Sequence, residues 1–237
     1  GGFDYFLSDN TSVTVSGEVG KYNFDGEGGG NLHKYQQPAN IDVYSVQANN
    51  SSRTGNYVSA TTSFLTKFDK TGMHKLEGNF NYRFRDGLAF ENIDEYVTDG
   101  NYSQTNNFLS RVITNNDEKS NDYRIKLDYT LPLKEGAKFE AGLQSRLQSE
   151  KEYFFIKNYD PSTGAFINNP LFTSDMFFKE DIHSIYSTYS GNLKAIQFMI
   201  GLRGEYTNRS IDHSKVDKPY TLDRFDVFPS AHLSYEL

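Results

Sequence analysis

The sequence contains no cysteine and no tryptophan, and its apolar residues never form a long uninterrupted run. Without cysteine there are no disulfides and no thiolate metal or redox sites. No stretch approaches the roughly 18 consecutive apolar residues of a membrane-spanning helix, and the N-terminus has no signal-peptide pattern. The basic residues form no run and the net charge is -7, which argues against a nucleic-acid partner.

Aromatic residues, by contrast, are abundant. Hydrophobic residues make up 36% of the 237 positions, and 15% are aromatic, consisting of 19 Phe and 17 Tyr. The mean hydropathy is -0.67. Disordered chains are poor in aromatic residues, so this composition indicates a folded chain that is long enough for one large domain or two small ones.

The apolar residues recur at every second position in the stretch LDYTLPLKEGAKFEAGLQSRLQ, residues 127–148. Its apolar column contains Leu127, Tyr129, Leu131, Leu133, Phe139, Ala141, Leu143 and Leu147. Its other column is charged or polar and includes Lys126, Asp128, Lys138, Glu140 and Arg146. This period of two predicts a hairpin of β-strands with one apolar and one polar face.

The same alternation predicts an all-β fold. The predicted strands are 3–7, 12–22, 58–68, 73–85, the two arms of 127–148, 182–190, 197–206 and 225–237. The strand at 182–190 has the weakest pattern, because apolar and hydroxyl residues occur on both of its faces.

The connections between these strands alternate in length. Short polar turns are predicted at residues 8–10, 69–72, 134–137 and 191–194, and long connections at residues 23–55, 86–121, 154–181 and 210–224. In an antiparallel meander, this alternation places all short turns at one end of the sheet and all long loops at the other.

Short periplasmic turns, long extracellular loops and one lipid-facing column per strand are typical of outer-membrane barrels. We therefore expect an antiparallel up-and-down meander that forms part of a large transmembrane β-barrel, with residues 1–237 as one partial barrel domain. Phe84, Tyr123 and Tyr206 lie where an aromatic girdle is expected. The predicted count of about nine strands is odd, which suggests a piece of a larger barrel.

A second interpretation is a soluble β-sandwich or small barrel that binds carbohydrate through aromatic loops. A sheet with one apolar face can bury that face against a second sheet instead of lipid. A closed two-layer sandwich would refute the membrane interpretation.

Several short stretches resemble the barrel region of TonB-dependent outer-membrane receptors: residues 2–9, 158–166, 180–193, 201–207 and 227–237. The resemblance implies a 22-stranded barrel with an N-terminal plug, which imports a ligand with energy from TonB. The sequence lacks a recognisable plug, a TonB box and a terminal strand ending in an aromatic residue. We therefore expect an internal barrel segment, with outer-membrane lipid and an unidentified imported ligand as partners and TonB contacted through segments outside this chain.

Aromatic residues in the predicted long loops are the candidate ligand-binding residues. The set comprises Tyr96, Tyr102, Phe154, Phe155, Tyr159, Phe166 and Phe172, and Phe108, Phe177 and Phe178 lie near them in sequence. Exposed aromatic faces can stack on sugars or apolar ligands. The same residues can instead pack against one another and hold long loops folded.

No catalytic or metal-binding pattern stands out. The five histidines are scattered singly, the acidic stretch at 115–122 lacks the spacing of a calcium loop, and GEGGG at 26–30 lacks the residues of a phosphate-binding loop. We therefore expect no enzyme activity, no metal and no cofactor.

Overall fold

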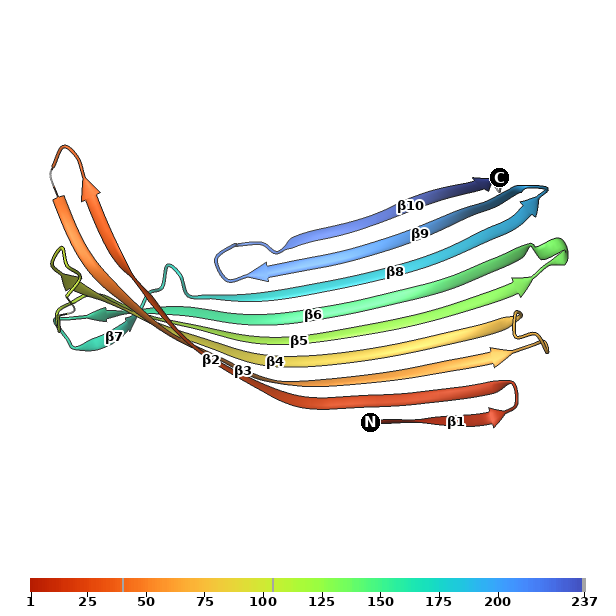
Figure 1. The fold of residues 1–237 in the computed structure, drawn as a ribbon, viewed down its shortest axis with the longest axis horizontal. Helices are drawn as coiled ribbons and strands as arrows, with labels where there is room; N and C mark the ends of the chain where they lie inside the picture. The colour runs from red at the N-terminus through yellow and green to blue at the C-terminus, as the bar shows by residue number, and fades with distance from the viewer. Residues whose placement is uncertain (40, 104, 236–237) are drawn as a thin grey trace.

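The computed structural model describes residues 1–39, 41–103 and 105–235, and these residues form one sheet of ten strands (Figure 1). The strands are β1 (Gly2–Ser8), β2 (Thr11–Gln36), β3 (Ile41–Lys67), β4 (Lys75–Thr98), β5 (Phe108–Pro132), β6 (Lys138–Asp160), β7 (Ala165–Asn168), β8 (Ser174–Leu193), β9 (Ile196–His213) and β10 (Tyr220–Tyr235). One short 3-10 turn, η1 (Lys134–Gly136), lies between β5 and β6.

The strands form an antiparallel meander. Their order in the sheet is β1-β2-β3-β4-β5-β6-β8-β9-β10, and the short β7 pairs with the loop end of β6. Every strand in this order pairs antiparallel with its neighbour in sequence, apart from the β6–β8 pair that β7 interrupts. The predicted all-β, up-and-down fold class is confirmed.

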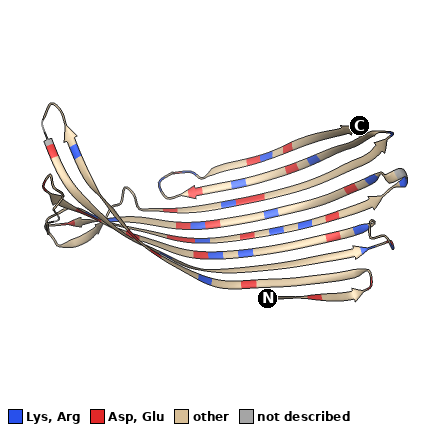
Figure 2. Ribbon diagram, in the orientation of Figure 1, with Lys and Arg blue, Asp and Glu red and all other residues tan. Residues whose placement is uncertain are grey.

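The sheet is a single curved layer whose two faces differ in polarity. Register places Val58 opposite Phe84, Tyr82 opposite Tyr123 and Leu127 opposite Leu143, so apolar residues of adjacent strands share one face. We call this the apolar face. The opposite face, here called the polar face, carries rows such as Gln148, Glu180 and Arg209. Acidic and basic residues are interleaved along the strands rather than gathered at one edge (Figure 2).

The described residues contain no buried hydrophobic side chain, so the sheet has no conventional core. Leu143 is 44% exposed, Ile185 69% and Leu202 54%, although all three lie within long strands that have a neighbour on each side. A sandwich would cover these side chains with a second sheet, and the structure has only one layer. The alternative of a closed soluble sandwich is therefore wrong.

The two ends of the sheet differ as the alternating connections predict. Two residues join β1 to β2 and two join β8 to β9, while residues 68–74 and 133–137 form the other short connections. All four lie at the right-hand end of Figure 1, and the remaining connections lie at the other end.

The long connections are mostly strand, which corrects the predicted loop boundaries. Residues 23–36 and 41–55 extend β2 and β3, and residues 86–98 and 108–121 extend β4 and β5. In these extensions both faces carry polar residues, and apolar residues such as Phe90, Ile93 and Leu109 no longer alternate strictly with them, so the period-two signal disappears while backbone pairing continues. Nine of the ten strands match predicted strands; β7 was predicted as loop, and residues 236 and 237 of the last predicted strand lie outside the described residues.

Candidate functional site

Several predicted aromatic residues meet near the loop ends of β4, β5, β6 and β7. The ring centroids of Tyr96 and Phe108 are 4.8 Å apart, and those of Tyr159 and Phe166 are 5.4 Å apart. The guanidinium carbon of Arg111 lies 4.3 Å from the Phe108 ring centroid, 5.3 Å from that of Tyr159 and 5.5 Å from that of Phe166. We call these five residues the Arg111 cluster; each guanidinium–ring contact of this kind stabilises by roughly 0.5–1 kcal/mol where exposed.

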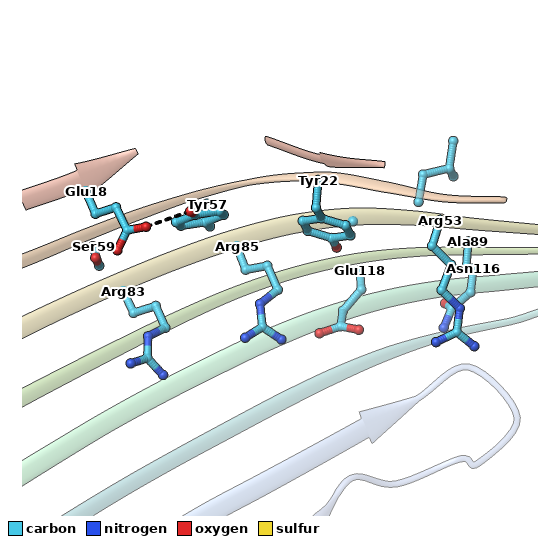
Figure 3. A pocket seen from close by; sticks show the side chains of 12 residues that line it. Glu18, Tyr22, Arg53, Tyr57, Ser59, Arg83, Arg85, Ala89, Asn116 and Glu118 are labelled. Atoms are coloured by element: carbon cyan, nitrogen blue, oxygen red, sulfur yellow. Dashed lines mark hydrogen bonds between the residues drawn. The ribbon is translucent and has the colours of Figure 1, made fainter. Parts of the chain in front are cut away.

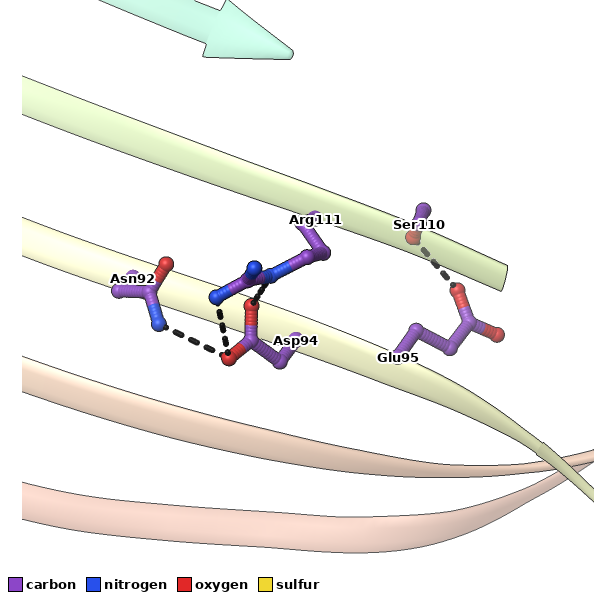
Figure 4. Close-up of polar contacts among 5 residues, drawn as sticks. All are labelled: Asn92, Asp94, Glu95, Ser110 and Arg111. Carbon is purple, nitrogen blue, oxygen red and sulfur yellow. Dashed lines mark hydrogen bonds and ion pairs between the residues drawn. The ribbon is translucent and has the colours of Figure 1, made fainter. Parts of the chain in front are cut away.

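Asp94 holds the arginine of this cluster in place (Figure 4). Arg111 Nε donates to Asp94 Oδ1 at 2.8 Å, and Asn92 Nδ2 donates to Asp94 Oδ2 at 3.2 Å. Asp94 is only 8% exposed. The hydrogen bond and charge of the carboxylate raise the pKa of Arg111 above its usual value. The guanidinium therefore stays charged and is fixed against the aromatic rings.

The next residue, Glu95, anchors the opposite face of the same strand. Its Oε1 accepts hydrogen bonds from Lys34 Nζ at 2.8 Å and from the fully buried Ser45 at 2.6 Å, and its Oε2 accepts from Ser110 at 3.2 Å. Burial alone would raise the pKa of Glu95, but these hydrogen bonds and the charge of Lys34 outweigh it and lower that pKa. Glu95 thus ties together β2, β3, β4 and β5.

The other four candidate aromatic residues are separated from the Arg111 cluster. Tyr102 packs edge-on against Tyr44 at 5.7 Å, in a second group with His33. The Nζ atom of Lys157 lies 5.1 Å from the ring centroid of Phe155. Phe154, the preceding residue, projects from the other face of the strand. Phe172 is 57% exposed in the connection before β8. The structure therefore brings together three of the seven predicted residues, Tyr96, Tyr159 and Phe166.

A cavity of about 650 Å³ occupies the polar face of β2 to β5 (Figure 3). Arg53, Arg83 and Arg85 line it together with Tyr22 and Tyr57. The Tyr22 and Tyr57 rings lie against glycines of neighbouring strands, because a Cβ atom at Gly20 would come within 2.4 Å of Tyr57, and one at Gly55 within 2.5 Å of Tyr22. These two glycines leave space that the flat rings fill.

Sequence reasoning did not single out the residues of this cavity as a site. Arg83 and Arg85 stand in the polar column of a predicted strand, which signals only that they share a face. Arg53 was placed in a predicted loop, and only the continued pairing of β3 with β4 brings it onto that face. Arg111, at the centre of the aromatic cluster, also carried no sequence signal.

Within the described ranges, no group of three or more His, Asp or Glu side chains is placed to hold a metal ion. The same part of the chain contains no helix long and apolar enough to cross a membrane.

Comparison with known proteins identifies the family. Residues 66–237 match the outer membrane protein beta-barrel family, which is well over half of the chain. No curated protein matches the chain.

Among solved structures, the chain resembles the ferric citrate transporter FecA in its unliganded form, with a TM-score of 0.51, 12% identity and 97% of this chain covered. It also matches BauA, the ferric preacinetobactin receptor of Acinetobacter baumannii, with a TM-score of 0.49, 10% identity and 98% of this chain covered. The chain spans only 38% of the first of these structures and 36% of the second. At this identity, the likeness to FecA shows a shared fold, and it confirms the resemblance to TonB-dependent receptors at that level.

With an antiparallel meander, a continuous exposed apolar face and a family match over residues 66–237, the chain belongs to the outer membrane protein β-barrel family and resides in the outer membrane.

Proposed function

We propose that the chain is a wall segment of an outer-membrane receptor or transporter, with its apolar face toward lipid, its polar face toward the lumen and its long hairpins outside the cell. The observation that carries this proposal is the exposed apolar face, which a water-soluble protein would cover. Burying one such Leu, Ile or Phe side chain away from water stabilises by about 1.5–3 kcal/mol.

The dimensions of the apolar face support a lipid contact. On β9 it runs from Ile196 to Tyr206, ten residues apart, which is about 33 Å along the strand at about 3.3 Å per residue. A strand tilted by about 40° covers about 25 Å of membrane thickness over that length, which equals the apolar band of outer-membrane barrels.

Aromatic residues mark both limits of this band. The stacked rings of Tyr82 and Tyr123, 4.8 Å apart, lie at the limit of the apolar face that is farther from the short turns. Near the short turns, His74 shares a 2.8 Å hydrogen bond with the hydroxyl group of Tyr129 and packs against Phe68 at 4.7 Å. Amphipathic rings at these positions suit the two lipid–water interfaces.

The loop ends provide the ligand-capturing surface in this proposal. Phe108 of the Arg111 cluster is 40% exposed, and Phe172 and Tyr102 lie in the connections beyond the strands. Such rings combine mutual packing with an exposed aromatic surface, so the two interpretations of these residues are compatible. Tyr96, Tyr102, Phe154, Phe155, Tyr159, Phe166 and Phe172 remain the candidate ligand-binding residues.

The role in this proposal is binding and import rather than catalysis, and coupling to TonB lies in parts of the protein outside this chain. The fold neighbours are described as a ferric citrate transporter and a ferric preacinetobactin receptor. At 12% and 10% identity their substrates are not transferred to this chain. The residues of this chain are therefore the basis for inferring the chemical class of its ligand.

Cysteine labelling of the intact protein in whole cells tests the orientation. Because the chain has no cysteine, Thr163→Cys in the β6–β7 turn and Lys70→Cys in the β3–β4 turn introduce single thiols within it. We expect a membrane-impermeant maleimide to label Thr163→Cys in intact cells and Lys70→Cys only after the outer membrane is permeabilised. Equal labelling of both variants in intact cells would contradict the proposal.

A pull-down of the intact protein with the periplasmic domain of TonB tests the coupling. Retention of the protein by immobilised TonB domain, with no retention by the resin alone, is the expected result. Failure to bind under conditions that preserve the barrel would remove TonB from the proposal and leave the orientation test unaffected.

A further inference from the structure

Four arginines form a line on the polar face of the β3–β5 region. Register places Arg53 opposite Ala89 and Arg85 opposite Tyr57, while Arg124 on β5 lies opposite Asn81, two residues from Arg83. Since side chains alternate between the two faces, all four guanidinium groups project to the polar side. We call Arg53, Arg83, Arg85 and Arg124 the arginine track.

None of these four arginines has a carboxylate oxygen within 4.0 Å among the residues that the structure describes. On the polar face of β8 to β10 the situation is reversed. There Arg203 pairs with Glu205, Arg209 with Glu180 and Arg224 with Asp226. The polar face therefore has a region of arginines without ion pairs beside a region where the arginines are paired, although Asp122 lies opposite Arg83 in the neighbouring strand.

The unpaired region is also the hollowed one. Three arginines of the track line the 650 Å³ cavity, and Figure 3 shows their guanidinium groups projecting to the same side as the Glu118 carboxylate. Arg53 lies opposite Ala89, which is six residues from Arg83 on β4, so the arginines span about 20 Å along the strand. The cavity is therefore elongated in the strand direction, which is the direction of passage through a barrel.

Two carboxylates share this cavity with the arginines. Glu18 accepts a hydrogen bond from the Tyr57 hydroxyl group at 2.7 Å, so one of its oxygens is already occupied. Glu118 lies on the β5 side of the cavity. Three guanidinium groups against two carboxylates leave one net positive charge among the residues that line the cavity. Beside the cavity, Arg124 adds a positive charge and Glu150, which interacts electrostatically with Arg85, adds a negative one.

We propose that the arginine track binds an anionic solute that carries two or more carboxylate, phosphate or sulfonate groups. A guanidinium donates two parallel hydrogen bonds to such oxyanions, and arginines spaced along the strands match a solute with several anionic groups better than a single small ion. The Tyr22 and Tyr57 rings, held against glycines, add flat surface for an apolar part of the solute. This inference rests on the proposed function, in which the polar face lines the lumen.

The test uses the intact outer-membrane protein, purified in detergent, with pyranine as the probe. Pyranine carries three sulfonates on a flat aromatic system and its fluorescence anisotropy reports binding. We expect saturable binding that weakens as salt is added, because exposed charges are screened. Inositol hexakisphosphate should compete at a much lower concentration than inorganic phosphate, since it presents several phosphates together.

Variants then locate the site. Each of Arg53→Gln, Arg83→Gln and Arg85→Gln should weaken pyranine binding about tenfold, as expected for the loss of a charge-assisted hydrogen bond. Glu118→Gln should strengthen binding severalfold. Arg224→Gln is the matched control, because it removes the same charge from a neutralised pair on the same face and should change binding by less than about twofold.

The outcomes separate the two proposals. If the wild-type protein is labelled in the expected orientation but shows no saturable pyranine binding, the track is neutralised by other parts of the protein and the inference is wrong, while the proposed function stands. If Arg224→Gln weakens binding as much as Arg85→Gln, the binding is nonspecific and the inference is also wrong. Arg85→Lys, which keeps the charge, should retain more affinity than Arg85→Gln; equal losses would indicate misfolding instead of a lost charge and would overturn the assignment.

Discussion

Each long strand has two halves in different surroundings. The turn half runs from the short turns to the level of Phe84 on β4, and the loop half runs from there to the long connections. In the turn half one face is apolar and exposed, and an ion pair such as Lys75–Glu77 has side chains 33% and 44% exposed. In the loop half Asp94 and Glu95 are adjacent and buried on opposite faces.

The difference indicates that the surrounding medium determines which interactions stabilise each half, apolar contacts or hydrogen bonds. In the proposed orientation, lipid covers the apolar face of the turn half, so apolar side chains there need no protein partner. The same orientation places the loop half in water, where an apolar face would remain exposed. Hydrogen-bonded networks such as those of Asp94 and Glu95 then bind the strands to one another beyond their backbone ladder.

The largest predicted effect comes from placing a charge on the apolar face. Leu143 and Leu109 are matched, since they are 44% and 45% exposed, but only Leu143 lies in the turn half. Leu143→Arg should lower the free energy of unfolding by about 2–4 kcal/mol, because it moves a charge into lipid. Leu109→Arg should change it by less than about 0.5 kcal/mol.

Urea titration of the intact protein in lipid vesicles measures both values. The heat-dependent shift of barrel proteins on gels provides a check that each variant is folded before the titration. Equal losses at the two positions would show that lipid does not contact the apolar face, and they would remove the distinction between the two halves.

The second largest predicted effect concerns an ion pair in the loop half. Asp94→Ala leaves Arg111 without its partner in the loop half and should cost about 1–3 kcal/mol, the penalty for an unsatisfied, mostly buried charge. Glu77→Ala breaks the exposed Lys75–Glu77 pair in the turn half and should cost less than about 1 kcal/mol.

Hydrogen exchange distinguishes a local from a global effect of Asp94→Ala. Amides of β4 and β5 near Asp94 should lose protection while those of the turn half keep it. The double variant Asp94→Ala/Arg111→Leu should recover part of the loss, since it removes both charges. A double variant less stable than Asp94→Ala would contradict the importance of the unpaired charge.

Two glycines provide a third comparison. A Cβ atom at Gly142 in the turn half would lie 2.5 Å from the Tyr186 ring, whereas one at Gly28 in the loop half meets nothing within 4 Å. Gly142→Ala should displace the ring and cost about 1–3 kcal/mol. Gly28→Ala should be neutral or stabilise by up to about 1 kcal/mol, because alanine restricts the unfolded chain.

Thermal unfolding in detergent measures this comparison. Gly142→Ala/Tyr186→Leu serves as the control, because it removes the ring that the new methyl group would displace. The double variant should lose less stability than the sum of the losses measured for Gly142→Ala and Tyr186→Leu. Simple additivity would indicate that the ring does not rest on the glycine.

Sequence reasoning predicted the turn half far better than the loop half. In the turn half apolar residues such as Leu127, Leu131 and Leu143 recur at every second position, so they reveal both the strand and its face. In the loop half the sequence around Asp117 is polar throughout, and strand pairing leaves no periodic mark. Those strands are joined by the backbone ladder and by side-chain hydrogen bonds such as that from Asn116 to Glu152, and neither produces a period in the sequence.

The candidate sites follow the same division. Tyr96, Tyr159 and Phe166 attract attention as aromatic residues, although their meeting point depends on β7 folding back on β6. An arginine can pair along its own strand, as Arg203 does with Glu205, but a pair across strands depends on register: Arg209 meets Glu180 across β8 and β9, while Arg85 meets Tyr57. Register over many strands is a property of the assembled sheet, so the arginine track could not be read from the sequence.

The smallest predicted effect is the response of the loop half to acid. The folded-state pKa of Glu95 lies below its unfolded value, so the stabilisation is complete above the unfolded pKa of about 4.3 and is lost as the pH falls through the lower folded pKa. Hydrogen exchange of the β3 amides around Ser45, corrected for the intrinsic pH dependence, should therefore show faster local opening at about pH 3 than at pH 6. Glu95→Gln, which cannot ionise, should abolish that difference while the turn half stays equally protected. If acid loosens β3 in Glu95→Gln as much as in the wild-type protein, another group is responsible, and the loop half does not depend on the Glu95 carboxylate.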